Sequence, residues 1–464
     1  MTRDVAEDLA EFASGAADLP VQAQASTLND LIDTLACAAA GLGSGGVGEI
    51  RGILSDWSGK PEARLWFNAE AAPAPWAALY NGIASHAVEF DDTHDRAILH
   101  AGITVIPAVA AAAERRGNIP GSELIASIAV GVDVACRLAL ATNCGPGETG
   151  WLLTPLCGTF GAAAGAARAL GLDAEQTLNA LGLAYAQAAG NGQATIDGAL
   201  AKRLQAGLAA KAGTLAAIMA AAGITGARQV FEGKRGFYAV YQASDYDRSK
   251  IARGLGEQFE IEKLSFKPYP CCRWTHAALE AALAARAENA SPANLESIHV
   301  SVNRQAYNST GDPIAVKRKP RNVVDAQFSI PFAVAAALVD GQVGLEHFTE
   351  TAIARADLLD VAAKVSVDIG DDWSSDQTRS VSPARLTLLT ADGREITRTV
   401  DRPSGGSGDP NIDRILRDKF IRCCGIAGLR EDLAVARLEA LTVIGRADNA
   451  VAVLRNVTGD VAPA

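Results

Sequence analysis

Residues 81–107 hold most of the side chains that could do chemistry. Three of the six histidines fall here, at His86, His94 and His100. The same stretch carries the carboxylates Glu89, Asp91, Asp92 and Asp95. A histidine that titrates near neutrality, beside carboxylates that fix its tautomer, can move a proton to or from carbon. We therefore favour acid/base chemistry for this cluster.

Two other interpretations of the cluster remain open. His86, Asp91, Asp92 and His94 offer enough nitrogen and oxygen ligands for a divalent ion, although no H-E-x-x-H spacing is present. Alternatively, Asp91 and Asp92 cap the next segment and the histidines are surface residues.

A second constellation lies at 197–207, with the sequence DGALAKRLQAG. Lys202 and Arg203 stand there among Ala, Leu and Gly, on a helix whose other faces look buried. A lysine in such a place usually extends its ammonium to water. In a protein with a net charge of −11, it could instead hold a substrate carboxylate.

The third constellation is KPYPCCRWTH, at 267–276. Two prolines two positions apart predict a rigid extended segment from which Lys267 and Tyr269 project, before a helix that His276 begins. The segment falls where the helical region ends, and domain junctions are favoured places for ligand clefts. A rigid linker is the alternative. Nothing nearby pairs Cys271 or Cys272 with a base, so thiol catalysis is not favoured.

The elements that must position these residues divide the chain in two, as its length of 464 residues suggests. Apolar residues at helical spacing predict helices at 21–42, 72–85, 108–115, 122–142, 159–170, 174–188 and 198–222. The glycine-rich 41–46 follows a helix rather than a strand, so it predicts a helix end and a loop, not a nucleotide site. Residues 1–264 are expected to form an all-α domain.

Beyond residue 264 the pattern changes to alternating apolar and polar residues. Strands are predicted at 295–302 and 364–369, with a hairpin at 385–400 that turns at Asp392-Gly393. Helices are predicted between them at 275–287, 326–338 and 349–363. Residues 265–406 should form a smaller, lid-like α+β domain with an antiparallel sheet, and 407–464 should return to the helical domain.

Composition narrows the function classes. The acidic charge and the lack of a basic block argue against nucleic acid. The N-terminal sequence has no signal-peptide pattern, and apolar runs such as 215–222 fall short of the roughly 20 residues that span a bilayer. We expect a cytoplasmic protein with no membrane partner. The eight cysteines predict reduced thiols, and their spacing predicts no structural metal.

Together these stretches resemble the 2-methylcitrate dehydratase family, also called MmgE/PrpD, which includes cis-aconitate decarboxylase and iminodisuccinate epimerase. The resemblance runs in order through HAVEFDDTH at 86–94, His100 to Pro107, CGTFG at 157–161, Asp197-Gly198 with Lys202, KPYP at 267–270 with Cys272 and His276, and QFS at 327–329. Because the motifs are ordered over most of the chain, the resemblance is specific.

The resemblance implies a large all-helical domain, a smaller α+β domain, a homodimer, and no metal or organic cofactor. Family members act on small di- or tricarboxylates at the carbon next to a carboxylate. Carried over position by position, the family's site residues are Glu89, Asp91, Thr93, His100, Lys202 and Lys267. We further expect Arg203, Tyr269, Cys272 and His276 to contact the substrate.

Several positions depart from the family pattern. Glu89 stands for an aspartate, and Ala101-Gly102 stands for Pro-Ser. Leu152 and Gln205 replace histidines, and Phe332 replaces a tyrosine. Fewer polar donors predict a smaller or less charged acid than 2-methylcitrate.

We therefore expect a cofactor-independent lyase, a dehydratase or hydratase, that forms a carbanion next to a carboxylate of a small hydroxy or unsaturated acid. Lys202 and Lys267 would neutralise carboxylate oxygens, and His100, oriented by Asp91 and its neighbours, would be the acid/base. Epimerisation, decarboxylation and an inactive carboxylate-binding relative are the alternatives.

Overall fold

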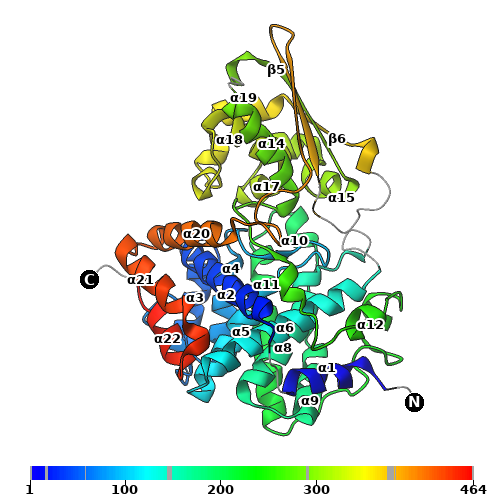
Figure 1. The fold of residues 1–464 in the computed structure, drawn as a ribbon, viewed down its shortest axis with the longest axis vertical. Coiled ribbons are helices and arrows are strands. Elements are labelled where there is room, and N and C mark those ends of the chain that lie inside the picture. The colour runs from blue at the N-terminus through cyan, green and yellow to red at the C-terminus, as the bar shows by residue number, and fades with distance from the viewer. Residues whose placement is uncertain are drawn as a thin grey trace.

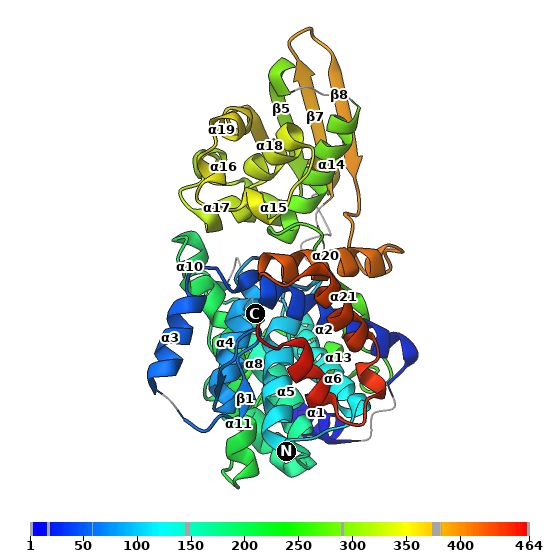
Figure 2. The same ribbon diagram turned by 90° about the vertical axis from the view of Figure 1, so that its left-hand side faces the viewer.

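The computed structural model describes residues 3–15, 19–57, 59–143, 149–288, 292–373, 381 and 383–461. Two domains lie one above the other, a large helical domain and a smaller α+β domain (Figures 1 and 2). This agrees with the predicted fold class. The seven cysteines in these ranges are buried, and Cys144 lies outside them.

The helical domain is built mainly from Ala-rich helices. Its first part comprises α1 (Val5–Ser14), α2 (Val21–Gly41), α3 (Val47–Trp57), α4 (Ala74–His86), α5 (Gly102–Arg116) and α6 (Gly121–Ala141). It continues with α8 (Leu153–Leu170), α9 (Ala174–Tyr185), α10 (Gln193–Ile196), α11 (Ala201–Ala221), α12 (Phe237–Tyr241) and α13 (Ser249–Ala252). Two short ladders complete it, β1 (Ala63–Arg64) with β2 (Ala71–Ala72), and β3 (Thr93–His94) with β4 (Leu264–Ser265).

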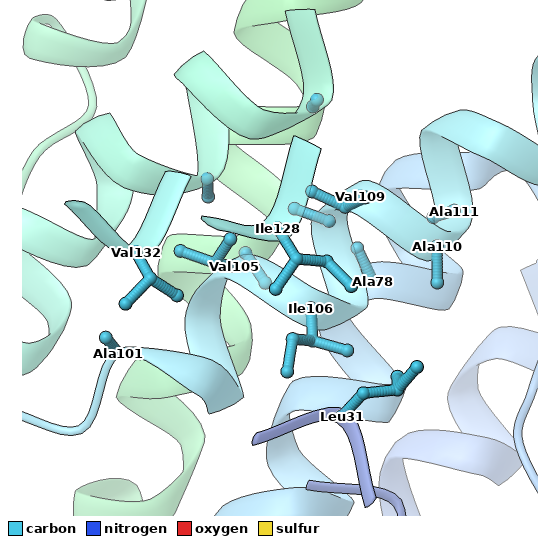
Figure 3. Close-up of a cluster of buried hydrophobic side chains, with 14 of the residues drawn as sticks. Leu31, Ala78, Ala101, Val105, Ile106, Val109, Ala110, Ala111, Ile128 and Val132 are labelled. Carbon is cyan, nitrogen blue, oxygen red and sulfur yellow. The ribbon is translucent and has the colours of Figure 1, made fainter. Parts of the chain in front are cut away.

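Helix α5 lies at the centre of this domain. Val105, Ile106 and Val109 pack there against Ile128 and Val132 of α6 (Figure 3). Small residues let the neighbouring helices approach closely. The result is a dense core around α5, whose first turn follows the loop that carries His100.

The crossing of α4 and α11 shows the effect of small residues most directly. A Cβ on Gly207 would lie 2.2 Å from the carbonyl oxygen of Leu79, and one on Gly82 would lie 2.8 Å from the Cα of Gly207. Larger residues at either position would force the helices apart. This contact brings the start of α11, with Lys202, to the end of α4, with His86.

Helices α6 and α11 are each 21 residues long and apolar enough, by length and composition alone, to cross a membrane. They extend further than the apolar runs noted in the sequence. In α6, 94% of the apolar window is buried inside the protein, against 56% in α11. Burial in a protein core accounts for the composition of α6, so the test is weak evidence for a membrane span.

The smaller domain contains a four-stranded sheet in the order β6-β5-β7-β8. Its strands are β5 (Leu295–Val302), β6 (Val365–Ile369), β7 (Ala384–Thr390) and β8 (Glu395–Val400). The predicted hairpin turn is present, with Gly393 at φ 81°. The sheet is mixed rather than wholly antiparallel, because β6 pairs with β5 in parallel. The long helical connection from 303 to 364 permits this crossover.

The helices of the smaller domain are α14 (His276–Ala287), α15 (Arg304–Ala306), α16 (Ile314–Arg318), α17 (Val323–Gln327), α18 (Ile330–Asp340) and α19 (Ala356–Ala363). The helix predicted at 326–338 is divided, because the side chain of Ser329 caps a new helix by accepting from the N–H of Phe332. The helix predicted at 349–363 starts only at Ala356.

Three C-terminal helices, α20 (Ile412–Ile426), α21 (Glu431–Thr442) and α22 (Ala450–Val457), pack on the helical domain. Helix α20 lies against α2 at the face nearest the smaller domain (Figures 1 and 2). Two connections cross between the domains, at 265–275 and at 401–411.

Candidate active site

The loop between α4 and α5 carries the acidic residues and His100. A two-residue ladder joins this loop to the segment that crosses between the domains, with Thr93 paired to Ser265 and His94 to Leu264. Because Lys267 follows this ladder by two residues, it comes to lie opposite Glu89. The close crossing of α4 and α11 brings Lys202 to the same point.

Glu89 lies between two lysines. Lys267 Nζ is 3.0 Å from Glu89 Oε1 and 3.2 Å from the Glu89 carbonyl oxygen, and Lys202 Nζ binds Glu89 Oε2. Glu89 has φ 55°, a left-handed conformation that is uncommon outside glycine. The residue with this strained backbone is thus the one whose carboxylate contacts both lysines.

Glu89, Lys202 and Lys267 form a lysine triad. For Glu89 and Lys267, charge pairing shifts the pKa more than burial does. Burial alone would raise the pKa of Glu89, but Lys202 and Lys267 hold it well below its usual value. Burial alone would lower the pKa of the fully buried Lys267, but Glu89 and Asp91 raise it above the usual range. Glu89 is therefore ionised and Lys267 is charged at neutral pH.

Asp91 lies behind the lysines, between two imidazoles. His86 Nδ1 is 3.0 Å from both of its carboxylate oxygens, and His100 Nδ1 is 3.1 Å from Oδ2. Burial would raise the pKa of Asp91, but the two imidazoles and Lys267 hold it below its usual value. Asp91 is completely buried and is placed to orient both rings.

His100 has the contacts expected of a base. Its Nδ1 is also 2.6 Å from the carbonyl oxygen of Asp92, and its backbone N–H donates to Thr154 Oγ1 at 3.0 Å. The Asp92 carbonyl and the Asp91 carboxylate, which can only accept, place the hydrogen on Nδ1 and leave the lone pair on Nε2, which lies 3.9 Å from Glu89 Oε1. Burial, the largest influence, lowers the pKa of His100 to about 4. The imidazole is thus neutral and able to accept a proton at neutral pH.

His86 and His94 differ in their surroundings. With its Nδ1–H donated to Asp91, His86 accepts on Nε2 from Lys202 Nζ at 2.9 Å. It therefore touches the lysine triad, a contact that the sequence did not indicate. His94 accepts on Nδ1 from the N–H of Ala97 and donates from Nε2 to Glu260, so it anchors the loop to the helical domain.

The smaller domain covers the cluster. Gln327 donates from Nε2 to the carbonyl oxygen of Val88 at 3.0 Å, and the Phe328 ring lies 5.0 Å from Lys202 Nζ. Cys272 is held next to Gln327, because its backbone N–H donates to the carbonyl oxygen of Gln327. Burial raises the pKa of the Cys272 thiol to about 11, which leaves it protonated and unreactive at neutral pH.

Three residues expected to contact the substrate have other partners. Arg203 Nη1 lies 3.4 Å from the carbonyl oxygen of Gly45. His276 is fully buried, lies 3.2 Å through Nε2 from the carbonyl oxygen of Cys271, and packs against the ring of Tyr269. The contacts of His276 and Tyr269 thus lie within their own segment, and nothing here brings them to Glu89.

The departures from the family pattern also have local explanations. Gln205 receives the N–H of Asn191 on Oε1 and donates to its carbonyl oxygen from Nε2, a double contact that an amide can make. Phe332 is fully buried and packs on Phe348 in the core of the smaller domain. Its replacement of a tyrosine therefore changes that core, not the polar cluster. Leu152 is half-buried near Gly192.

Two buried lysines, Lys419 and Lys317, were not predicted from the sequence. Lys419, on α20, is buried and donates to Asp33 Oδ1 at 2.6 Å, to the Phe90 carbonyl oxygen, and to that of Lys267 at 3.3 Å. Lys317 donates to the Ser309 carbonyl oxygen, and burial lowers its pKa. The short basic run KRKPR at 317–321, which was not counted as a basic block in the sequence, was the available signal for Lys317. Nothing local marks Lys419.

A metal site is not favoured by the donor set. Within the described ranges, no group of three or more His, Cys, Asp or Glu side chains is arranged to hold an ion. The carboxylates that come nearest to such an arrangement are already paired with lysines or imidazoles. The cluster can instead bind an anion, accept a proton on His100 Nε2, and stabilise negative charge through Lys202 and Lys267.

The chain belongs to the MmgE/PrpD family. The N-terminal domain model of this family matches residues 7–249, and its C-terminal domain model matches residues 269–439. The second match spans both the smaller domain and the helices α20 and α21.

Three of the proteins similar to this chain are cis-aconitate decarboxylases. A cis-aconitate decarboxylase from Aspergillus terreus is 31% identical over 361 residues, which is 73% of this chain and 72% of the relative. Cis-aconitate decarboxylases from Mus musculus and Homo sapiens are each 27% identical, over 78% and 79% of this chain and 72% and 75% of their own lengths.

Proposed function

We propose that this protein is a cofactor-independent lyase that takes a proton from the carbon next to a carboxylate of a small hydroxy acid and eliminates water. The family and its decarboxylase relatives support an enzyme that acts on a small carboxylic acid. The observation that carries the more specific proposal is the neutral imidazole of His100 with a free Nε2 lone pair.

The first step moves the α-proton to His100 Nε2. The electron pair left on carbon spreads onto the adjacent carboxylate, whose oxygens face Lys202 and Lys267. Positive charges fixed where negative charge develops lower the barrier, because they need no reorganisation during the reaction. The C–O bond to the β-hydroxyl then breaks, and a proton from the imidazolium completes the water molecule that leaves.

A substrate carboxylate must compete with Glu89 for Lys202 and Lys267 when it binds. The Glu89 carboxylate already occupies both lysines, so a substrate carboxylate has to displace one of these contacts. Lys202 is the better candidate for exchange, because its side chain is 11% exposed whereas that of Lys267 is fully buried. The substrate would then lie between Lys202, His100 and the covering Phe328.

Decarboxylation is the second candidate, favoured by the activity named for the relatives. There the carbanion arises by loss of CO2 and needs a proton afterwards. Neutral His100 has no proton on Nε2 to give, so Lys202 would have to supply it. For this reason we place elimination first.

A panel of small acids separates the candidates. Hydroxy, unsaturated and amino dicarboxylates would be incubated with the purified protein, following conjugated C=C absorbance, CO2 release and thermal shift. Elimination predicts a C=C signal without CO2. CO2 release would replace our proposal with decarboxylation, and a thermal shift without turnover would indicate a carboxylate-binding relative.

We also propose that the chain forms a homodimer, as the family resemblance implies. Light scattering should then give twice the chain mass of 48.0 kDa. A single-chain mass at micromolar concentration would contradict this.

A further inference from the structure

Two fully buried carboxyl groups on the far side of the His100 loop lack the partners that carboxylates need. Asp30, on α2, and Asp92 are both at 0% exposure. Among the described residues, both oxygens of Asp30 and Oδ1 of Asp92 have no hydrogen-bond donor. Unpaired carboxylates in a protein interior are too unfavourable to persist, and the charge of Asp92 bears on Asp30. Something must satisfy these oxygens.

The start of α5 brings the two groups together. The backbone N–H of Ala101 donates to Asp92 Oδ2 at 3.0 Å. At the next residue, a Cβ on Gly102 would lie 2.3 Å from Asp30 Oδ1 and 2.8 Å from Thr34 Oγ1. Both carboxyls therefore reach the first turn of the same helix. Gly102, where the family pattern has serine, is what allows Asp30 to come so close.

We propose that Asp30 and Asp92 share one proton, and that this carboxyl pair is a positioning device for His100. A single O–H···O bond between them pairs Oδ1 of Asp92 with one of the two Asp30 oxygens, with no ion or ligand. The carbonyl oxygen of Asp92 accepts from His100 Nδ1 at 2.6 Å, so whatever holds Asp92 also holds the tautomer of the base. The role for His100 rests on the proposed function, whereas the shared proton does not.

The surroundings favour a retained proton. The charged groups that face the pair are Asp33 on α2, Asp91 on the loop, and Lys419 on α20. Lys419 is already committed to Asp33, at 2.6 Å. Burial, followed by the charge of Asp91, raises the pKa of Asp92 to about 8, and burial, followed by the charge of Asp92, raises that of Asp30 well above its usual value. The pair thus holds its proton through neutral pH.

The proton can be detected directly by infrared spectroscopy of the whole protein. At pH 7, the wild-type spectrum minus that of the double variant D30N/D92N should contain the C=O stretch of a protonated carboxyl group. Thr34→Val removes a neighbouring unpaired oxygen on the same helix and should leave this band unchanged. A difference spectrum with only ionised-carboxylate bands would overturn the proposal.

If the double variant does not fold, the same infrared comparison can be made with Asp30→Asn or Asp92→Asn alone. In either variant, the amide N–H would then donate to the remaining carboxylate, so the protonated band should again be lost. A band that survives in both single variants would overturn the sharing, because it would belong to another group.

Kinetics test the positioning role. Asp30→Asn keeps a hydrogen-bond donor beside Asp92, so kcat should stay within about threefold of wild type at pH 7. Asp30→Ala leaves Asp92 unsupported, and kcat should fall by about tenfold or more with KM nearly unchanged. Equal kcat values for the two variants would overturn the positioning role. If no acid is turned over at all, the proposed function fails, but the infrared result still decides the shared proton.

Discussion

The Nε2 atom of His100 decides the chemistry at the scale of single residues. Burial lowers the pKa of this imidazole to about 4, so it stays unprotonated from neutral pH down to about pH 5. A base must be unprotonated to act, so kcat/KM should hold over this range and fall about tenfold per pH unit below about pH 4. Circular dichroism at each pH would show that the protein remains folded. An acid limb centred near 6.5, the usual histidine value, would contradict the assignment.

Lys202 provides a second test at this scale. Lys202→Met removes the more exposed of the two ammonium groups, so kcat/KM should fall by about 10²-fold through loss of a charged hydrogen bond to the substrate. Lys211→Met is the matched control, because Lys211 lies on the same helix with its ammonium over the Trp76 ring, away from Glu89. Similar losses in both variants would point to a general effect on α11.

Residue types marked Glu89, Lys202 and Lys267 as candidates, the family resemblance implied their place in the site, and the structure brings these three together. The sequence did not indicate the contact between His86 and Lys202, because this depends on how closely α4 and α11 cross at Gly82 and Gly207. Such a tertiary approach leaves no pattern within either helix. Nor did the sequence indicate that Asp91, expected to orient His100, accepts from His86 as well.

At the scale of elements, Arg137 joins α6 to the segment that leads into the domain junction. Its guanidinium pairs with Asp133 at 2.5 Å and donates to four carbonyl oxygens, those of Ile251, Arg253, Gly254 and Gln258. Arg137→Met removes the charge partner of the buried Asp133 and the side-chain donor to these carbonyl oxygens. The free energy of unfolding should fall by about 3–5 kcal/mol in urea titrations.

Arg116→Met is the control for this prediction. Arg116 is exposed and donates to one carbonyl oxygen, that of Ala169, so its loss should cost about 1 kcal/mol or less. Equal destabilisation in the two variants would contradict the account of Arg137 as a buried anchor.

Helix periods and strand alternation predicted most elements within a few residues, because each pattern records which face is buried. They did not predict the parallel pairing of β5 with β6. Alternation identifies the face of a strand but not the direction of its neighbour, and β6 lies beyond a crossover of about 60 residues. The split between α17 and α18 depends on the cap by Ser329, which apolar periodicity hides.

At the scale of the whole molecule, the site needs both domains. The helical domain supplies Lys202 and the loop with His100, the crossing segment supplies Lys267, and the smaller domain covers them with Gln327 and Phe328. The sequence placed a site near the junction from the proline-rich segment at 267–270. It could not place Lys419, which reaches the carbonyl oxygens of Phe90 and Lys267 from a helix 329 and 152 residues further along the chain.

This assembly predicts a reaction that needs no metal. Glu89 is paired with Lys202 and Lys267, and Asp91 is paired with two imidazoles, so dialysis against EDTA should leave turnover unchanged. Elemental analysis of the dialysed protein is the accompanying measurement. Activity that disappears on dialysis and returns with a divalent ion would favour the metal interpretation of the His86 to His94 cluster.

The exchange of substrate hydrogen with solvent tests the central claim most directly. In D2O, NMR should show the wild-type protein placing deuterium at the carbon next to the carboxylate of a bound acid. His100→Ala should lower this rate by about 10² or more with its thermal unfolding unchanged, while the surface variant His299→Ala keeps the wild-type rate. Exchange at the wild-type rate in His100→Ala would contradict the assignment of His100 as the base.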